Sequence, residues 1–465
     1  MDIDKGQEIL FSNFSYDPQV YYFIYCGDVK AYYLNTFVRK VLQKKLGQRE
    51  VRFIAIIPDI FTQYDFENII VINPSVQKKC TDDSLDCSCR IPGSVFMQAV
   101  SKSPAIRKLI HTILHNQNEL YIYLFESIQE MYLDEIEGVS LLGPDKDIAK
   151  KWNNKIFQYK QVKGLIPTAE HFFCDEYSSL CATTDDLRSR WRNGIFVSCA
   201  YSAAGANSLV SKSQEETENW GKGKKGPFLV SRFIPHTLDP TVLGVVANEN
   251  DVYIAGVADQ VIKGGNRFVG SLYPSQASQE QKKLLHQYTV EVGKLLGKQG
   301  YRGIFGCDYI IADDGTIYFI EVNARKQGTT LEFCYTLEQA LPDGAPMLPE
   351  LEYYAVTENA FPENCIEPSL RYDEICWGTH NYKLLKEKQT IGYIPHNPHA
   401  RLSFNKVAHG QLQNDFVILE HVGAGLKVMA GTFLARVVAI ANKREAVERG
   451  LRQGVGFIEQ TITEA

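Results

Sequence analysis

Residues 306–325 read GCDYIIADDGTIYFIEVNAR, two apolar runs on either side of an Asp-Gly pair. An Asp-Gly pair between such runs is the strongest short-range signal for a β-hairpin. If Asp314–Gly315 forms a two-residue turn, Asp308 pairs with Glu321 across the two strands. Asn323 then shares a face with Glu321, because side chains alternate between the faces of a sheet. A three-residue loop would instead move Asp308 out of register with Glu321.

This pairing predicts a cation site. Two carboxylates opposed across neighbouring strands, with Cβ atoms ~5 Å apart, repel each other and destabilise a sheet. A cation between them turns that repulsion into attraction. Asp308, Glu321 and the amide of Asn323 offer three oxygen ligands, which suit Mg²⁺, an ion that keeps some waters and takes phosphate oxygens as further ligands. An exposed hairpin with scattered acidic residues is the alternative.

Length, composition and charge exclude several classes of protein. The chain has 465 residues, enough for about three domains. Hydrophobic residues make up 45% and charged residues 22%, as in ordinary globular proteins. A net charge of -6 argues against a nucleic-acid partner. No apolar run is long enough to span a membrane and no signal-peptide pattern opens the chain, so we expect a cytoplasmic protein with no membrane association.

The pattern along the chain predicts an α/β and α+β multidomain protein. Continuous apolar runs, typical of buried parallel strands, occur at Val20–Cys26, Val51–Ile57 and Tyr121–Phe125. Helical patterns lie between these runs, so we expect a parallel sheet covered on both faces. The predicted domains are an α/β domain over residues 1–142, a second domain over residues 143–350 and a small mixed domain over residues 351–465.

The spacing of Asp308, Glu321, Asn323 and Arg325 has the form D-x12-E-x-N-x-R. It resembles the metal-binding end of ATP-grasp enzymes, and the resemblance extends over roughly residues 143–330. Within that superfamily the chain resembles the pheganomycin-type peptide ligases and the ligase that loads an amino acid onto the butirosin carrier protein. The resemblance implies an ATP-grasp fold with a Rossmann-like pre-grasp domain. It also implies ATP and one or two Mg²⁺ ions as cofactors, with Mn²⁺ as an alternative ion.

The resemblance assigns residues to the phosphates of ATP. Lys155, twelve residues before Pro167, resembles the first nucleotide-binding lysine of the superfamily. Taken without the resemblance, it is one of several lysines on a solvated helix. Ser198 stands where a second lysine is usual, so another basic residue or backbone donors would replace that lysine. In the small-residue loop that follows, backbone N–H groups can approach phosphate oxygens, and its candidate residues are Ser202, Ala204 and Gly205.

The resemblance also assigns the base and the ribose. Ser231, Arg232 and Phe233 lie in the predicted strand that contacts adenine through its backbone, although relatives often carry Glu where Ser231 stands. Asp239 is placed near the ribose, and a turn aspartate before Pro240 is an equal alternative.

Two arginines are candidates for binding the reacting carboxylate or its phosphate. A guanidinium group matches planar anions in a bidentate manner and keeps its charge at any working pH. Arg325 lies in register with Glu321 and Asn323, and Arg267 flanks the predicted strand pair before residue 274. We assign both to catalysis.

The sequence therefore predicts an ATP-dependent ligase. The enzyme would activate a carboxylate as an acyl phosphate and join it to an amine, releasing ADP and phosphate. Acylation of a carrier-protein thiol, a kinase reaction and a nucleotide-binding protein without turnover are the alternatives. The expected partners are small carboxylate and amine substrates, with a peptide or an acyl carrier protein as options. The sequence does not define the oligomeric state, and a homodimer is one option.

Overall fold

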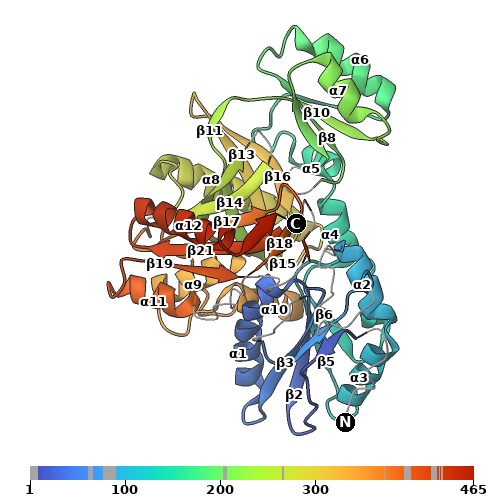
Figure 1. Ribbon diagram of the computed structural model, residues 1–465, viewed down its shortest axis with the longest axis vertical. Helices are drawn as coiled ribbons and strands as arrows, with labels where there is room; N and C mark the ends of the chain where they lie inside the picture. The colour runs from blue at the N-terminus through green and yellow to red at the C-terminus, as the bar shows by residue number, and fades with distance from the viewer. Residues whose placement is uncertain are drawn as a thin grey trace.

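The computed structural model describes most of the chain. The described residues are 9–60, 66–76, 91–202, 207–263, 267–370, 372–391, 400–419, 427–428, 430 and 433–464. The chain forms a parallel sheet at one end, a small lobe at the other and a large antiparallel sheet between them (Figure 1). Multidomain α/β and α+β architecture is confirmed.

The N-terminal part forms a six-stranded sheet in the order β1-β4-β3-β2-β5-β6. Its strands are β1 (Phe11–Ser12), β2 (Tyr21–Cys26), β3 (Val51–Ile57), β4 (Ile69–Val71), β5 (Leu120–Leu124) and β6 (Val139–Leu142). All pairs are parallel except that of β1 with β4. The covering helices are η1 (Val29–Leu34), α1 (Asn35–Leu46), α2 (Gly93–Lys102) and α3 (Pro104–Leu114), and η2 (Leu133–Glu135) precedes β6.

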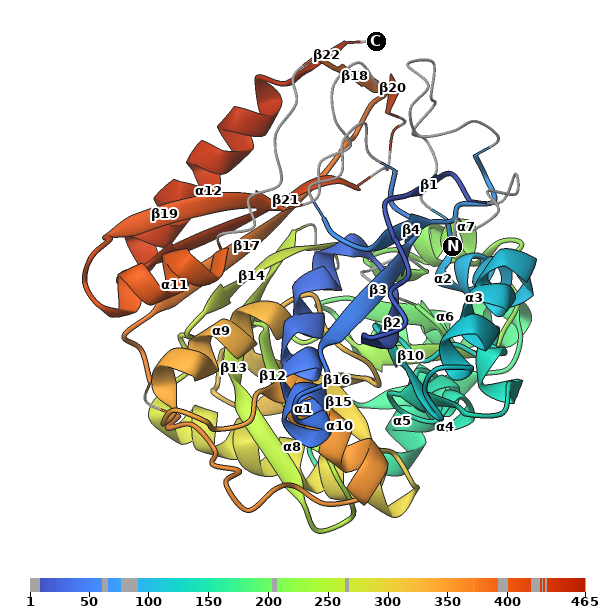
Figure 2. The ribbon, with the colours of Figure 1, turned by 90° about the horizontal axis from the view of Figure 1, so that it is seen from below.

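This sheet is buried on both faces, as its apolar strands predict. Phe23 and Tyr25 pack on the α1 side, whereas Tyr22 and Ile24 pack on the α2 and α3 side. The two figures agree that α1 covers one face and that α2 and α3 cover the other (Figures 1 and 2). β2 and β5 therefore lie in a sheet that is closely packed on both faces.

Two short helices lead to the small lobe, α4 (Lys146–Trp152) and α5 (Lys155–Val162). The lobe is a four-stranded antiparallel sheet in the order β7-β10-β8-β9, seen at the top of Figure 1. Its strands are β7 (His171–Cys174), β8 (Ile195–Cys199), β9 (Ser208–Ser211) and β10 (Phe228–Arg232), and its helices are α6 (Tyr177–Arg188) and α7 (Gln214–Gly221).

A nine-stranded sheet fills the centre, in the order β11-β15-β12-β13-β14-β17-β21-β19 with β16 paired to β15. Its strands are β11 (His236–Leu238), β12 (Pro240–Val246), β13 (Val252–Lys263), β14 (Arg267–Tyr273), β15 (Gly303–Ala312), β16 (Ile317–Asn323), β17 (Cys376–Lys383), β19 (Asn414–Leu419) and β21 (Phe433–Ala441). The helices are α8 (Gln279–Lys298), α9 (Thr330–Ala340), α10 (Leu348–Glu358), α11 (Ala400–Ala408) and α12 (Arg444–Glu459).

The C-terminal strands continue this central sheet, because β14 pairs with β17. A further three-stranded sheet consists of β20 (Lys427–Val428), β18 (Lys388–Thr390) and β22 (Ile462–Glu464). The predicted division between residues 350 and 351 falls inside α10. The domain boundaries at 142 and 350 stay predictions.

The β15–β16 hairpin corrects one prediction and confirms another. Gly315 has a φ of 85° and donates its N–H to the carbonyl of Ala312 at 2.8 Å, so the loop has three residues rather than the predicted two. That loop alone would place Asp308 opposite Ile320. A β-bulge between Asp308 and Tyr309 shifts the register back by one residue, and Asp308 pairs with Glu321 as predicted.

Candidate functional site

Asp308 lies at the centre of a buried polar network on β15. Its side chain accepts hydrogen bonds from Thr241 Oγ1 at 2.7 Å and from Asn323 Nδ2 at 2.9 Å. The residue is only 8% exposed. Burial, followed by the nearby charge of Glu321, raises the pKa of Asp308 to about 6. A divalent cation would reverse this effect, because it stabilises the ionised carboxylate.

Glu321 is paired with a cation from a distant segment. Lys155, the first residue of α5, places its Nζ on the Oε2 atom of Glu321. Gln158 holds α5 against β16: its side chain accepts from Val322 N at 2.9 Å and donates to Val322 O at 2.7 Å. The predicted phosphate lysine is thereby brought to a predicted metal ligand.

Asn323 and Arg325 are in contact, as their shared face predicts. Arg325 Nη2 donates to Asn323 Oδ1 at 3.1 Å, and Arg325 Nε lies 3.8 Å from a carboxylate oxygen of Glu126. Glu126 follows β5 of the first sheet. Asn153 completes this contact, since its amide donates to Glu126 at 3.4 Å and its oxygen accepts from Ala324 N at 3.2 Å.

The oxygen set of Asp308, Glu321 and Asn323 fits Mg²⁺ by its chemistry. In the described part of the chain, no three His, Cys, Asp or Glu side chains form a metal cluster by themselves. Two carboxylates and one amide nevertheless suit an ion whose remaining positions go to phosphate oxygens and water. These side chains would hold an ion that arrives with a phosphate ligand, rather than enclose one completely.

Sequence reasoning missed four residues at this site. Thr241 on β12 and Gln327 after β16 contact Asp308, with Gln327 Nε2 at 3.5 Å. Gln260 on β13 also donates a hydrogen bond to Asp308. The fourth is Lys326, next to Arg325, whose Nζ lies 2.5 Å from a Glu352 carboxylate oxygen. These contacts leave no local sequence signal, since the partners come from other strands and helices.

Lys326, which follows β16, ties that strand to the first sheet. Its ammonium group donates to the carbonyl of Leu124, the last residue of β5, at 2.7 Å. It lies 2.5 Å from Glu352 on α10 and 4.2 Å from the centre of the Tyr123 ring. Lys326 and Glu352 are each 1% exposed. Burial lowers the pKa of Lys326, against the opposing effect of Glu352.

The small lobe carries the predicted nucleotide residues. Ser198 is buried on β8. Its Oγ donates a hydrogen bond to Cys199 O at 2.9 Å and also lies 3.1 Å from Ser202 Oγ. Ser231 is buried on β10, and Arg232 at the end of that strand is exposed. Phe233 donates its N–H to Gly194 O at 3.2 Å. The predicted loop residues Ala204 and Gly205 lie outside the described residues.

The two remaining predicted residues, Asp239 and Arg267, lie in different surroundings. Asp239, between β11 and β12, lies 3.0 Å from His236 Nε2. Burial alone would lower the pKa of His236, but its hydrogen bonds to Asp239 and to the Ile234 carbonyl raise it. Arg267 is exposed and pairs with Lys263 at the end of the hairpin where β13 leads into β14. Within the described ranges, Arg267 makes no hydrogen bond or ion pair with the Asp308 network.

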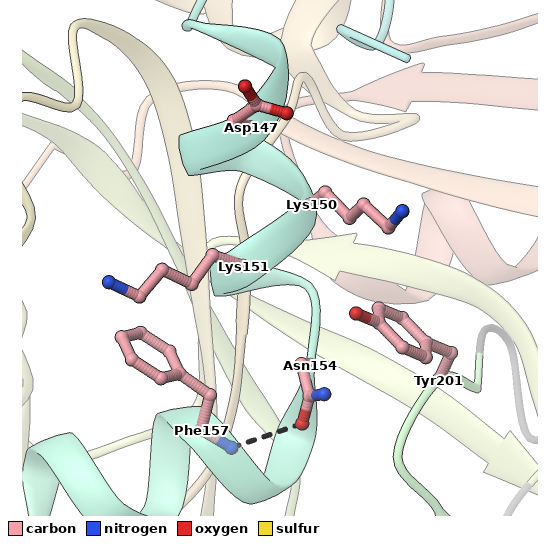
Figure 3. A pocket seen from close by; sticks show the side chains of 6 residues that line it. All are labelled: Asp147, Lys150, Lys151, Asn154, Phe157 and Tyr201. Carbon is pink, nitrogen blue, oxygen red and sulfur yellow. Dashed lines mark hydrogen bonds between the residues drawn. The ribbon is translucent and has the colours of Figure 1, made fainter. Parts of the chain in front are cut away.

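A pocket of about 300 Å³ opens beside α5 (Figure 3). It is lined by Asp147, Lys150, Lys151, Asn154, Phe157 and Tyr201. Asn154 caps α5 by accepting the N–H of Phe157 at 3.1 Å. Lys155 N donates to Ala200 O at 2.8 Å, so the pocket adjoins the end of β8 where the phosphate loop is predicted.

Comparison with known proteins identifies this arrangement. Residues 153–329 match the family described as an ATP-grasp domain. Over these residues the chain has the fold of an ATP-grasp domain. The matched segment includes Lys155, the β15 and β16 strands and the whole small lobe, and the predicted ATP-grasp fold is thereby confirmed.

Two curated relatives share part of the chain. The butirosin acyl-carrier protein–L-glutamate ligase of Niallia circulans is 22% identical over 208 residues, which cover 43% of this chain and 49% of the relative. The L-propargylglycine–L-glutamate ligase of Streptantibioticus cattleyicolor is 29% identical over 101 residues, which cover 22% of this chain and 20% of the relative. The chain thus spans about half the length of the first relative and a fifth of the second.

Solved structures share the fold at low identity. Carboxyaminoimidazole ribonucleotide synthase from Aspergillus clavatus, complexed with ATP, has a TM-score of 0.57 at 12% identity, covering 96% of this chain and 100% of that chain. The biotin carboxylase domain of 2-oxoglutarate carboxylase from Hydrogenobacter thermophilus, in complex with MgADP and bicarbonate, has a TM-score of 0.62 at 13% identity, covering 96% of this chain and 91% of that chain.

Among the described helices of the present protein, none has the length and apolar character to cross a membrane.

Gly306, two residues before Asp308 on β15, provides a test of how this strand packs. A Cβ atom at this position would lie 2.2 Å from Gln327 Nε2. We expect Gly306→Ala to displace Gln327 and to lower the free energy of unfolding by about 1–3 kcal/mol, as overpacking does. Denaturant unfolding measures this loss. Gly328→Ala is the matched control, since no atom lies within 4 Å of its added Cβ. Equal stability of both variants would contradict the packing argument.

Proposed function

We propose that this protein is an ATP-dependent ligase that joins a carboxylate to an amine and releases ADP and phosphate. One observation carries the proposal: Asp308 and Glu321 face each other on paired strands, with Asn323 beside them, inside an ATP-grasp domain. This set suits a magnesium ion bound to a triphosphate. Lys155 supplies a cation for the phosphates.

In the proposed reaction, a carboxylate oxygen attacks the γ-phosphorus of ATP. The bond from that phosphorus to the bridging oxygen breaks, and ADP leaves with the electron pair. An amine nitrogen then attacks the acyl carbon, loses a proton and expels phosphate. Bound Mg²⁺ would neutralise charge on the phosphates, the main requirement of phosphoryl transfer. We assign the binding of the carboxylate or the acyl phosphate to Arg325, a role supported by its contact with Asn323.

The names of the two curated relatives suggest the first substrate to test. Both name L-glutamate as a substrate of the ligase. We propose that L-glutamate or a similar amino acid is one substrate here and that an amino acid or a peptide is the other. The name of the Niallia circulans enzyme favours one alternative, in which a carrier-protein thiol accepts the acyl group.

The test is a screen of the full chain with MgATP and amino acids, supplied singly and in pairs with L-glutamate. Phosphate release is followed during turnover, and products are identified by mass spectrometry. We expect release to require a pair and the product mass to equal the sum of the pair less one water. A phosphorylated acceptor without free phosphate would indicate a kinase instead. A parallel reaction with a phosphopantetheine-bearing carrier protein detects thiol acylation.

Several narrower assignments belong to the same proposal. We propose that one or two Mg²⁺ ions bind, that Mn²⁺ can substitute for Mg²⁺, and that the protein acts in the cytoplasm. Arg267, which is exposed on β14, binds a substrate anion in this proposal. Phosphate release measured with Arg267→Ala tests that role.

A further inference from the structure

Protein groups already satisfy each candidate metal ligand in this structure. Asp308 accepts hydrogen bonds from Thr241 and from the amide nitrogen of Asn323. The Asn323 oxygen, the atom that a metal would require, accepts instead from Arg325. Glu321 is paired with Lys155. Protein donors therefore already occupy the oxygens that a metal ion would require.

A divalent ion and Lys155 compete for the same oxygen. The Lys155 ammonium lies on Glu321 Oε2, with side-chain exposures of 9% for Lys155 and 19% for Glu321. A metal ion bound to that oxygen would bring a double positive charge into contact with the ammonium group. The two repel strongly in a partly buried site, so Lys155 must leave Glu321 before a metal can bind there.

The displaced ammonium then needs another anion. Leaving it buried and unpaired is costly, since a buried charge loses its hydration. The backbone of Lys155 is held by its own N–H, which donates to Ala200 O at 2.8 Å, and by the Asn154 cap. Only the flexible side chain is free to change partner. A triphosphate beside α5 would supply the oxygens that receive it.

We infer that Lys155 makes divalent-ion binding conditional on the nucleotide. In the free protein Lys155 neutralises Glu321 and keeps the affinity for the ion low. When the triphosphate binds, Lys155 moves to its oxygens and Glu321 becomes available to the ion. The inference rests on the proposed function, since it takes this site to bind a metal–nucleotide complex. By linkage, the ion must strengthen nucleotide binding by the same factor.

The experiment titrates the full chain with Mn²⁺ and follows the electron paramagnetic resonance signal of the free ion. Without nucleotide, we expect Lys155→Met to bind Mn²⁺ about tenfold or more tightly than the wild type, because a nearby positive charge is gone. Lys160→Met, at an exposed position on the same helix, should leave the affinity unchanged. Adding Glu321→Gln to Lys155→Met should abolish the gain. Lys155→Gln serves as a second variant if Lys155→Met does not fold.

The two possible failures are distinguishable. Equal Mn²⁺ affinity of the wild type and both Lys155 variants without nucleotide would overturn the inference, even if the wild type turns over ATP. A wild type that binds no Mn²⁺ with or without a non-hydrolysable ATP analogue would overturn the metal site and the proposed function together. Nucleotide affinity, measured with and without Mn²⁺, should differ more in the wild type than in Lys155→Met.

Discussion

We expect Asp308→Asn to lower ATP-dependent phosphate release by about 10²- to 10³-fold, the usual effect of removing an electrostatic group from a reaction centre. The substitution keeps the shape of the side chain and removes its charge. Because burial raises the pKa of Asp308 to about 6, the ionised carboxylate is itself a cost to the fold. The variant should therefore remain folded, with a free energy of unfolding no lower than that of the wild type.

Steady-state phosphate release and denaturant unfolding, measured on the same preparations, check both parts of this prediction. Asp314→Asn is the matched control. Asp314 lies in the exposed loop of the same hairpin and accepts the N–H of Thr316 at 2.9 Å, a hydrogen bond that asparagine can also accept. A rate for Asp308→Asn equal to that of this control would exclude Asp308 from the metal site.

The second large effect concerns stability. We expect Lys326→Met to lower the free energy of unfolding by about 3–5 kcal/mol, because it leaves a buried carboxylate without its counter-ion. Glu352 is 1% exposed and lies 2.5 Å from the Lys326 ammonium. The substitution also removes the hydrogen bond from Lys326 to the Leu124 carbonyl. Chemical denaturation of the full chain measures the loss.

Two further variants test whether the loss of stability comes from the unpaired buried charge or from replacing any lysine by methionine. Lys294→Met removes the partner of Glu291 in an exposed pair, in which both side chains are 46% exposed, and should cost less than about 1 kcal/mol. Combining Lys326→Met with Glu352→Leu should recover a large part of the loss, since no buried charge remains. If the double variant were no more stable than Lys326→Met, the unpaired charge would not be its cause.

Local sequence pattern was sufficient where neighbouring residues determine the structure. The hairpin follows from two apolar runs and one Asp-Gly turn signal, whereas the predicted pairing of Asp308 with Glu321 is restored by a β-bulge. The loop length did not follow. The loop has one residue more than predicted, and the bulge adds one residue that offsets it. A turn signal in the sequence shows neither the third loop residue nor the bulge.

The parallel sheet was predictable for a similar reason. Strands buried on both faces leave continuous apolar runs, and those around Tyr22 and Ile54 predicted the β2 and β3 strands. The C-terminal strands show the limit of this reasoning. β17 joins the central sheet by pairing with β14, a contact between segments about a hundred residues apart that no local run encodes.

The amino-acid sequence by itself determined the acidic pair, the strands that carry it and the kind of ion it suits, because side-chain alternation and ligand chemistry act over a few residues. Only the tertiary structure decided which partners surround that pair. Lys155 reaches Glu321 from 166 positions away and Lys326 reaches Leu124 from 202 positions away. Arg267 makes no hydrogen bond or ion pair with the Asp308 network among the described residues. Such contacts depend on how helices and sheets pack, and packing is set by the shape of the whole buried interior.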